Sequence, residues 1–384
     1  MRTSAKLVWL LLGAAVIVAC STGSDDDTIR IGVTQPLTGP VAASGNYVVQ
    51  GAEIAATFLN DSGGLLGKEV QLFIEDNKSN PREAVASVEK LIMRDRVSVL
   101  MGAWSSTYTL AVMPRLIEHG VPMVVETSSS DKITTSANPW IFRISPTSAM
   151  EAEAFSAKVA DFGIAKADFL VVNNDWGRGA ADRFAEMLER NSIEVGVIET
   201  MDARAQDLSA QLAKIKASDG DTLFLTTGVE QITLVLKQAR EQRLTHRIIT
   251  TGGSSSPSQL IEQAGDAAEG TFHLLFFVPW FPEEVPNPDV AKAFVAEWNN
   301  REHDFAGLTE GFRGYDGIMT IAAGIEAAGS AEPDAIRQAL WDVNVRGING
   351  NISFIKQGPE GSESAQNAPN VYVVTIRDGK VALP

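Results

Sequence analysis

Strand-like and helix-like segments alternate along this chain in two successive runs, and this alternation limits the possible folds more than any other feature. The first run has short β-rich or apolar segments at 28–34, 70–74, 97–101 and 121–125. Helical periodicity between them covers 46–59 and a second segment that Pro81 opens, because proline suits a first helical turn. The continuous apolar runs are typical of strands buried on both faces.

The second run follows Arg143 and repeats the pattern. Its expected strands are at 169–172, 195–198, 223–225 and 248–250, and its expected helices are at 179–190, 208–217, 230–242 and 258–264. Such alternation predicts parallel sheets with right-handed crossovers, and hence two α/β lobes. The length of 384 residues also fits two domains better than one.

The last third offers too few elements for a third lobe. We expect helices at 288–300, 309–328 and 333–340, and strands at 352–355 and 371–376. We interpret residues 358–369, with the sequence GPEGSESAQNAP, as a loop. These elements are expected to return and complete the two existing lobes.

The first residues indicate export. Arg2 and Lys6 precede an apolar stretch at 7–19, about 13 residues long, which suits a signal peptide better than a membrane span. The stretch ends in the letters IVAC, which resemble the bacterial lipobox, in which the cysteine carries the lipid. We therefore expect a lipoprotein signal peptide at 1–19, lipidation at Cys20 and a flexible tether at 20–27.

Charge and cysteine content exclude other classes. The formal net charge is −16, and a nucleic-acid partner would need clustered Lys and Arg. Cys20 is the only cysteine, so no disulfide can form within the chain.

Enzyme signatures are absent from the sequence. It contains no glycine-rich dinucleotide fingerprint, no phosphate-binding loop and no serine nucleophile elbow. The histidines are scattered and do not pair at metal-ligand spacing; they are His119, His246, His273 and His303. We therefore expect no enzyme, no metal and no cofactor, although an acid/base pair among the many carboxylates stays open.

Polar clusters recur where expected strands end. They read GAWSST, ETSSSD, NNDWGRG, TTGVEQ and TGGSSSPS, and ETSSSD belongs to the stretch MVVETSSSDKIT at 123–134. A single serine or threonine in such a place is commonly an ordinary helix cap or turn residue. Five clusters exceed that need, and ligands of open α/β sheets bind outside the carboxyl ends of the strands. Hydroxyls and free N–H groups there could hold a small anion.

The sequence resembles bacterial solute-binding proteins of the branched-chain amino-acid (Leu/Ile/Val) type, which serve ABC importers. The likeness is carried by IRIGVTQPLTGP near the start, by a helix ending in NDSGGLLG, and by LVVNNDWGRG, LKQAR and AGDAAEG. It covers nearly the whole exported part. It implies two Rossmann-like lobes with parallel sheets, joined by a three-strand hinge, which is the type I periplasmic binding protein architecture. Lobe 1 would comprise 28–145 and 277–352, and lobe 2 would comprise 146–276 and 353–384.

The resemblance also implies a ligand site in the cleft between the lobes. Ser106, Thr127 and Ser129 match family positions that hold a ligand carboxylate and help with its ammonium. An aromatic position of the family matches Trp176. Further cleft positions match Ser44, Ser105 and Trp104.

The chain departs from the family in one place. Amino-acid binders usually carry an acid on the second lobe for the ligand ammonium, and the matching stretch TTGGSSSPSQ has no carboxylate. Glu230 lies near another strand end and could compensate. The two tryptophans indicate a flat or bulky apolar ligand group, although tryptophan packing alone explains them equally well. We expect an amino acid, a small or aromatic carboxylate, or an amide.

The resulting expectation is a monomeric, lipid-anchored protein, periplasmic or on the cell surface, that delivers a small molecule to an ABC permease. Its contact with the membrane would be through the lipid alone, and it would have no nucleic-acid partner. The alternative is a sensor of the same fold that reports its ligand to a regulator or receptor. The lipobox favours delivery.

Overall fold

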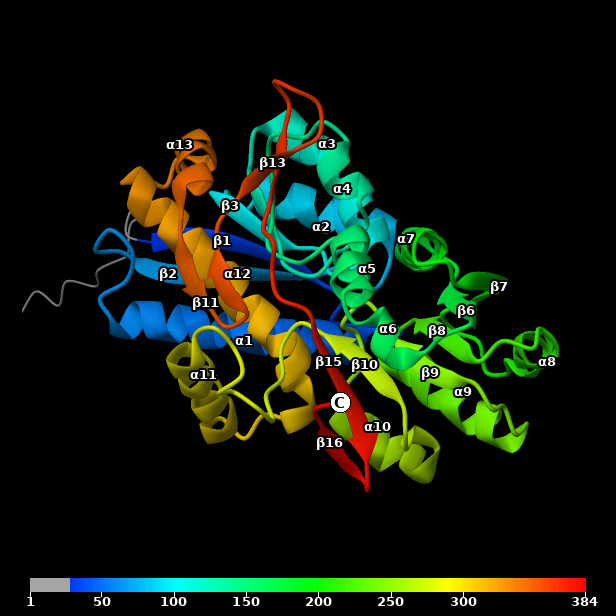
Figure 1. Ribbon diagram of the computed structural model, residues 1–384. Helices are drawn as coiled ribbons and strands as arrows, with labels where there is room; N and C mark the ends of the chain where they lie inside the picture. The colour runs from blue at the N-terminus through cyan, green and yellow to red at the C-terminus, as the bar shows by residue number, and fades with distance from the viewer. Residues whose placement is uncertain (1–27) are drawn as a thin grey trace, which may run out of the picture.

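The computed structural model describes residues 28–384, and Figure 1 shows two α/β lobes side by side. The chain starts with β1 (Thr28–Gln35), α1 (Ala42–Asp61), β2 (Glu69–Asp76), α2 (Pro81–Met93), β3 (Val99–Gly102), α3 (Ser106–His119), β4 (Met123–Val125), α4 (Lys132–Thr135) and β5 (Ile141–Arg143). It continues with α5 (Ser148–Ser156), α6 (Val159–Phe162), β6 (Lys166–Val172), α7 (Asp175–Arg190), β7 (Glu194–Met201), α8 (Ser209–Ala217), β8 (Thr222–Thr226), α9 (Val229–Glu241), β9 (Arg247–Thr250), α10 (Pro257–Ala264), η1 (Gly265–Ala268) and β10 (Phe272–Leu275).

The remaining elements return to both lobes. They are α11 (Pro288–Asn300), η2 (Phe305–Gly307), α12 (Leu308–Ala328), α13 (Pro333–Ala339), η3 (Leu340–Asp342), β11 (Val345–Gly347), β12 (Gly350–Ile352), β13 (Ile355–Gln357), β14 (Ser364–Gln366), β15 (Tyr372–Arg377) and β16 (Lys380–Ala382). Among residues 28–384, none of the helices combines the length and the apolar character needed to cross a bilayer.

Each lobe is built on one sheet. The first has the order β13-β14-β5-β4-β3-β1-β2, and the second has the order β16-β15-β10-β9-β8-β6-β7. Strands β1 to β5 pair in parallel, and so do β6 to β10, which confirms the two expected α/β lobes. The chain passes between the lobes three times: after β5, after β10 and after β14.

One expected boundary is wrong, and the reason is a polar strand. The sequence predicts that residues 353–384 belong to lobe 2 and that 358–369 form a loop, but β14 pairs with β5 and β13 pairs with β14 in the first sheet. The buried Arg143 Nε donates to Gln366 Oε1 at 2.6 Å, and Gln366 Nε2 donates to the carbonyl of Ser145 at 2.8 Å. Polar partners inside the protein therefore support a strand whose composition is that of a loop. The single strand expected at 352–355 is also wrong, because β12 ends at Ile352 and β13 begins at Ile355.

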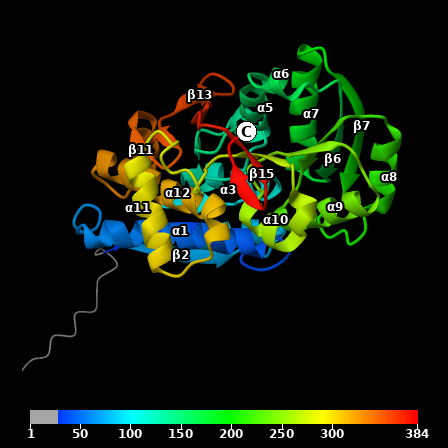
Figure 2. The same ribbon diagram turned by 60° about the horizontal axis from the view of Figure 1, so that its bottom comes forward.

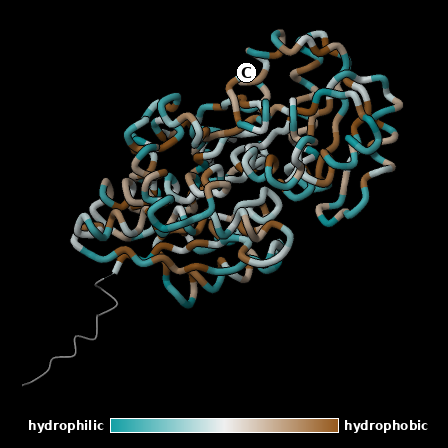
Figure 3. The backbone as a smooth tube through the Cα atoms, turned by 90° about the horizontal axis from the view of Figure 1, so that it is seen from below, coloured by the Kyte–Doolittle hydropathy of each residue, from teal (hydrophilic) through white to brown (hydrophobic). Residues whose placement is uncertain are grey.

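Hydrophobic burial follows the sequence pattern. Every residue of β3 and β4 is buried, as the continuous apolar runs predicted. Figure 3 shows apolar residues through the interior strands and polar residues along many outer loops. Helix α2 begins where expected, because Pro81 takes the first helical position and the Asn80 side chain accepts from the N–H of Arg82 at 2.9 Å.

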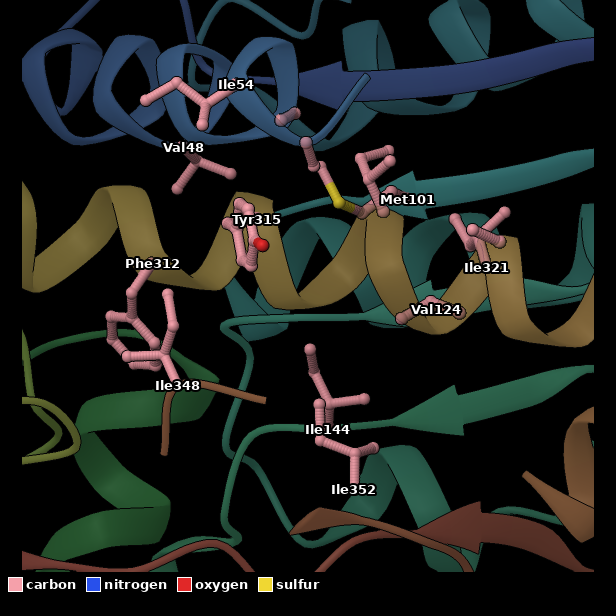
Figure 4. Packing of buried hydrophobic residues seen from close by; sticks show 14 of the residues in the cluster. Val48, Ile54, Met101, Val124, Ile144, Phe312, Tyr315, Ile321, Ile348 and Ile352 are labelled. Carbon is pink, nitrogen blue, oxygen red and sulfur yellow. The ribbon is translucent and has the colours of Figure 1, made fainter. Parts of the chain in front are cut away.

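Helices α1 and α12 pack against each other along the first lobe, as Figures 1 and 2 show. Figure 4 shows the side chains between and around them, including Val48, Phe312 and Tyr315. Two glycines bring the backbones together: a Cβ on Gly51 would lie 1.8 Å from the carbonyl oxygen of Gly311, and one on Gly314 would lie 1.9 Å from that of Val48. The position of α12 is therefore fixed by contacts that admit no side chain.

We expect Gly314→Ala to destabilise the protein by about 2–3 kcal/mol, because the added methyl group must push the two helices apart. The matched control is Gly179→Ala in α7, where a Cβ would meet nothing within 4 Å. That change should stabilise the protein by about 0.5–1 kcal/mol, since alanine favours a helix over glycine. Urea denaturation of both variants measures the difference, and equal effects would contradict this account of the contact.

Candidate functional site

A small pocket lies where the two lobes meet. Its cavity volume is about 20 Å³, which is little more than the room of one water molecule. The first lobe contributes Trp104, Ser105, Ser106, Thr127, Ser128 and Ser129, and the second contributes Trp176, Gly252 and Ser254. These residues follow β3 and β4 of the first sheet and β6 and β9 of the second, so they lie at the carboxyl ends of parallel strands. This is the place where ligands of open α/β sheets bind.

Ser106 keeps a hydrogen-bond donor available. It is the first residue of α3 and is buried, and its Oγ accepts from the N–H of Ser130 at 3.1 Å. That bond uses the oxygen as an acceptor and leaves the hydroxyl proton free to donate. Ser105, the preceding residue, makes no capping hydrogen bond through its side chain. Both hydroxyls can therefore donate to a ligand.

The hydroxyls after β4 divide into structural and available ones. Ser128 Oγ lies 2.7 Å from Thr109 Oγ1 and donates to the carbonyl of Trp104 at 2.9 Å, which fixes the loop. Thr127 Oγ1 is 3.3 Å from Glu126 Oε1. No described residue hydrogen-bonds to the side chain of Ser129, whose backbone carbonyl accepts from the N–H of Ser148 at 2.8 Å. The Ser129 hydroxyl is thus available for a ligand.

Arg143 holds this hydroxyl segment in place. Its Nη1 donates to the carbonyl oxygens of Ser130 at 2.6 Å and Ser128 at 3.3 Å, and its Nη2 donates to Thr134 Oγ1. Complete burial lowers the pKa of Arg143 to about 9. A buried guanidinium with several acceptors makes the segment rigid.

Two tryptophans border the pocket. Trp104 is buried and has a φ of 68°, a left-handed conformation that costs a bulky residue about 1–3 kcal/mol and is typical of functional sites. Trp176 lies in the first turn of α7 and packs on Gly252, where a Cβ would be 2.2 Å from Trp176 Cζ2. Gly252 therefore has to be a glycine for the indole to lie there.

The pocket brings together most of the residues expected from the sequence. Ser105, Ser106, Thr127, Ser129, Trp104 and Trp176 line it. Ser44 is on α1 and Glu230 is exposed at the start of α9, and neither lines this pocket. Cys20 lies outside the described residues. The binding role of each residue stays a prediction.

Four buried charged residues behind the pocket were not expected from the sequence. Each contacts one lining segment: Glu126 contacts Thr127, Glu151 Oε1 accepts from the N–H of Gly252 at 2.6 Å, and Arg313 Nη2 donates to the carbonyl of Gly253 at 2.8 Å. Glu310 Oε2 lies 3.1 Å from Arg313 Nε. Burial raises the pKa of Glu310, and the neighbouring indole N–H of Trp104 offsets part of that rise without completing a hydrogen bond.

The charges in this cluster do not balance. Three carboxylates face one guanidinium, and burial raises the pKa of Glu151 to about 8 and that of Glu310 to about 7. Burial also raises the pKa of Glu126. Desolvation is the largest cause in each case, because an ionised carboxylate loses its hydration inside the protein. Near neutral pH the charge behind the pocket therefore depends on pH.

A sequence signal for part of this cluster exists. Helix α12 is rich in glycine, alanine and isoleucine, yet Glu310, Arg313 and Asp316 recur in it at a spacing of three. This spacing places charged groups along one side of a helix that is otherwise apolar. Charges there need buried partners, and such groups are common at functional sites.

The chain matches known proteins over nearly its whole described length. The sequence model of the family named periplasmic binding protein matches residues 28–380. A leucine-, isoleucine-, valine-, threonine- and alanine-binding protein of Pseudomonas aeruginosa is 28% identical over 92% of this chain and 92% of its own length. A Leu/Ile/Val-binding protein of Rhizobium johnstonii is 29% identical over 88% of this chain and 90% of its own.

Solved structures agree with the fold. A leucine-binding protein from Thermotoga maritima has a TM-score of 0.81 and 25% identity, covering 93% of this chain and 97% of that one. A branched-chain amino-acid transporter substrate-binding protein from Streptococcus pneumoniae, in complex with isoleucine, also has a TM-score of 0.81, at 24% identity and with coverage of 92% and 97%. The family consists of solute-binding proteins and not of enzymes. The chain therefore belongs to the periplasmic binding protein family, with a role in solute binding.

Proposed function

We propose that this protein captures a small molecule with a polar head between its lobes and delivers it to an ABC import permease. The observation that carries the proposal is the pocket at the lobe junction, where the Ser106 and Ser129 hydroxyls have donors to spare and two indoles provide an apolar surface. Relatives named for binding branched-chain amino acids support the same role.

The pocket lining favours a polar head that accepts hydrogen bonds. Serine and threonine hydroxyls donate to a carboxylate or an amide carbonyl, and Trp104 and Trp176 can contact a flat or bulky group. The lining contains no carboxylate, so a ligand ammonium would have no direct anionic partner there. We infer that the ligand is a planar carboxylate or amide, in preference to an aliphatic amino acid.

We further propose that a lipid on Cys20 holds the exported protein at the membrane, on the basis of the IVAC ending of the apolar stretch. Cys20→Ala should leave the chain unlipidated and uncleaved by the lipoprotein signal peptidase. Metabolic labelling with a radioactive fatty acid, together with the apparent mass on a gel, measures both effects. Label incorporated into the variant would refute the anchor at this residue.

Replacement of a binding hydroxyl should weaken the ligand without affecting the fold. A hydrogen bond to a charged group contributes about 1.5–3 kcal/mol, so we expect Ser129→Ala to reduce affinity roughly ten-fold or more, as measured by calorimetry. Ser136→Ala is the control, because Ser136 is exposed and bonds only the nearby carbonyl of Lys132. Equal affinity in both variants would remove Ser129 from the site.

The ligand class can be tested by comparing L-leucine, benzoate and benzamide from about pH 6 to about pH 8.5. We expect the planar ligands to bind more tightly than leucine. Glu310 and Glu151 lose protons as the pH rises through their pKa values of about 7 and 8, which adds negative charge behind the pocket. Benzoate affinity should therefore fall with rising pH, whereas that of uncharged benzamide should change little.

The opposite result has a definite meaning. Leucine that binds more tightly than both planar ligands, and increasingly so as the pH rises, would show that buried carboxylates attract its ammonium. Glu230→Gln tests the other source of negative charge: Glu230 does not line the pocket, so we expect the variant to keep the same order of affinities for the three ligands. A loss of leucine binding in this variant would instead show that Glu230 supplies the anion.

A further inference from the structure

Several hydrogen bonds and ion pairs join the two lobes around the pocket, and they differ in burial. Near the surface, Thr107 Oγ1 donates to Asp175 Oδ2 at 3.0 Å, and Arg183 Nε lies 3.3 Å from Asp131 Oδ2. Partly exposed pairs of this kind contribute little, because water and salt screen them. Deeper inside, Arg313 of α12 in lobe 1 donates to the carbonyl of Gly253 in lobe 2 at 2.8 Å. This bond is charge-assisted and buried, so it is the stronger contact.

The Arg313 guanidinium is held from several directions. Its side chain is 1% exposed, and its Cζ lies 5.2 Å from the ring centre of Phe276 and 5.5 Å from that of Phe312. Glu310 approaches it from the preceding turn of α12 at 3.1 Å. Burial raises the pKa of the Glu126 and Glu151 carboxyl groups, and the positive charge of Arg313 offsets part of that rise in each. The ion pair and the two rings therefore hold the guanidinium beside Gly253, although its Nε and Nη1 complete no hydrogen bond among the described residues.

The loop that accepts this bond is part of the pocket wall. Gly252 and Ser254, on either side of Gly253, line the pocket. Gly253 has a φ of 61°, and a Cβ on it would lie 2.7 Å from the Phe276 ring and 2.9 Å from Arg313 Nη2. Glu151 fixes the neighbouring N–H of Gly252 from within lobe 2. The loop at 252–254 therefore lines the pocket on one side and contacts lobe 1 on the other.

We propose that Arg313 is a positioning residue that ties the lobe 2 wall of the pocket to lobe 1, so that occupancy of the pocket and closure of the lobes stabilise each other. The proposal rests on the proposed function, because it concerns the same pocket. Opening the lobes must break the bond from Arg313 to Gly253, whereas contacts within either lobe can persist. A ligand that contacts both walls would hold the loop in the position in which this bond forms.

Interlobe distances in the free protein test the proposal without any ligand. Spin labels are placed at Arg82→Cys in α2 of lobe 1 and Lys237→Cys in α9 of lobe 2, both exposed positions. Cys20→Ser removes the only native cysteine. Pulsed electron resonance then gives the populations of short and long distances. We expect Arg313→Met to raise the ratio of long to short distances roughly ten-fold or more, from the strength of a charged hydrogen bond.

Arg337→Met is the matched control. Arg337 also pairs with an acid three residues before it, Asp334 at 2.9 Å, and also lies over an aromatic ring, 5.0 Å from the centre of Trp140. All three residues belong to lobe 1, so this variant should leave the distance distribution unchanged. Arg313→Lys should give an intermediate distribution, because lysine keeps the charge but has no planar fork. If Arg313→Met does not fold, the distance distribution of Arg313→Lys still tests the proposed contact.

The possible outcomes distinguish a failure of the proposed Arg313 contact, here called the tie, from a failure of the proposed function. Distributions that match the unmodified protein in both Arg313 variants would overturn the tie, and so would an equal shift in Arg337→Met. A parent protein whose melting temperature is raised by none of L-leucine, benzoate and benzamide would count against the proposed ligand class, while the distances of the free protein still decide the tie. With a probe that binds, the tie predicts faster dissociation from Arg313→Lys than from Arg337→Met.

Discussion

The carboxyl ends of the parallel strands of both sheets meet at one junction. The polar groups exposed there need hydrogen-bond partners, and the surrounding structure supplies them. Backbone N–H and C=O groups leave their ladders at the ends of β3, β4, β6 and β9, and burial without partners would cost stability. Hydroxyl side chains, glycines and a few buried charges supply those partners. The same groups make the junction polar enough to bind a solute. The groups that support the junction and the groups proposed to bind the ligand thus belong to the same short segments.

Within the segment ETSSSD, some hydroxyls support the loop and others are available to a ligand. Ser128 is used by Thr109 and by the Trp104 carbonyl, whereas the Ser129 hydroxyl has no partner among the described residues. Arg143 fixes the backbone on both sides of Ser129 through the carbonyls of Ser128 and Ser130. The available hydroxyl is therefore presented from a rigid support, which reduces the entropy that a ligand must remove on binding.

Sequence patterns predicted the two lobes because the spacing of apolar residues in their strands and helices matches the residues that are buried. Apolar runs such as 121–125 become buried strands, and the polar residues that follow them reach the pocket. The pattern failed where long-range polar contacts decide the structure. Strand β14 has the composition of a loop, and it is a strand because it pairs with β5 and its side chains bond distant partners such as Arg143 and the Ser145 carbonyl. Glu151 and Arg313 lie in helices far apart in sequence, and their meeting at the loop 252–253 depends on the tertiary fold. Ser44 was expected from the family resemblance and Glu230 from its place near a strand end, and neither lines the pocket.

The contacts that hold the 252–254 loop involve its main chain. Glu151 accepts from the N–H of Gly252 and Arg313 donates to the carbonyl of Gly253, so neither contact depends on the side chain of Ser254. Substitutions at Ser254 would lose its own bond to the Gly252 carbonyl at 3.4 Å but would keep both of these contacts. In evolutionary terms, the residue at position 254 can vary without loss of the two contacts that anchor the loop to α5 and α12. New specificities could arise by single substitutions in a loop whose position is already secured.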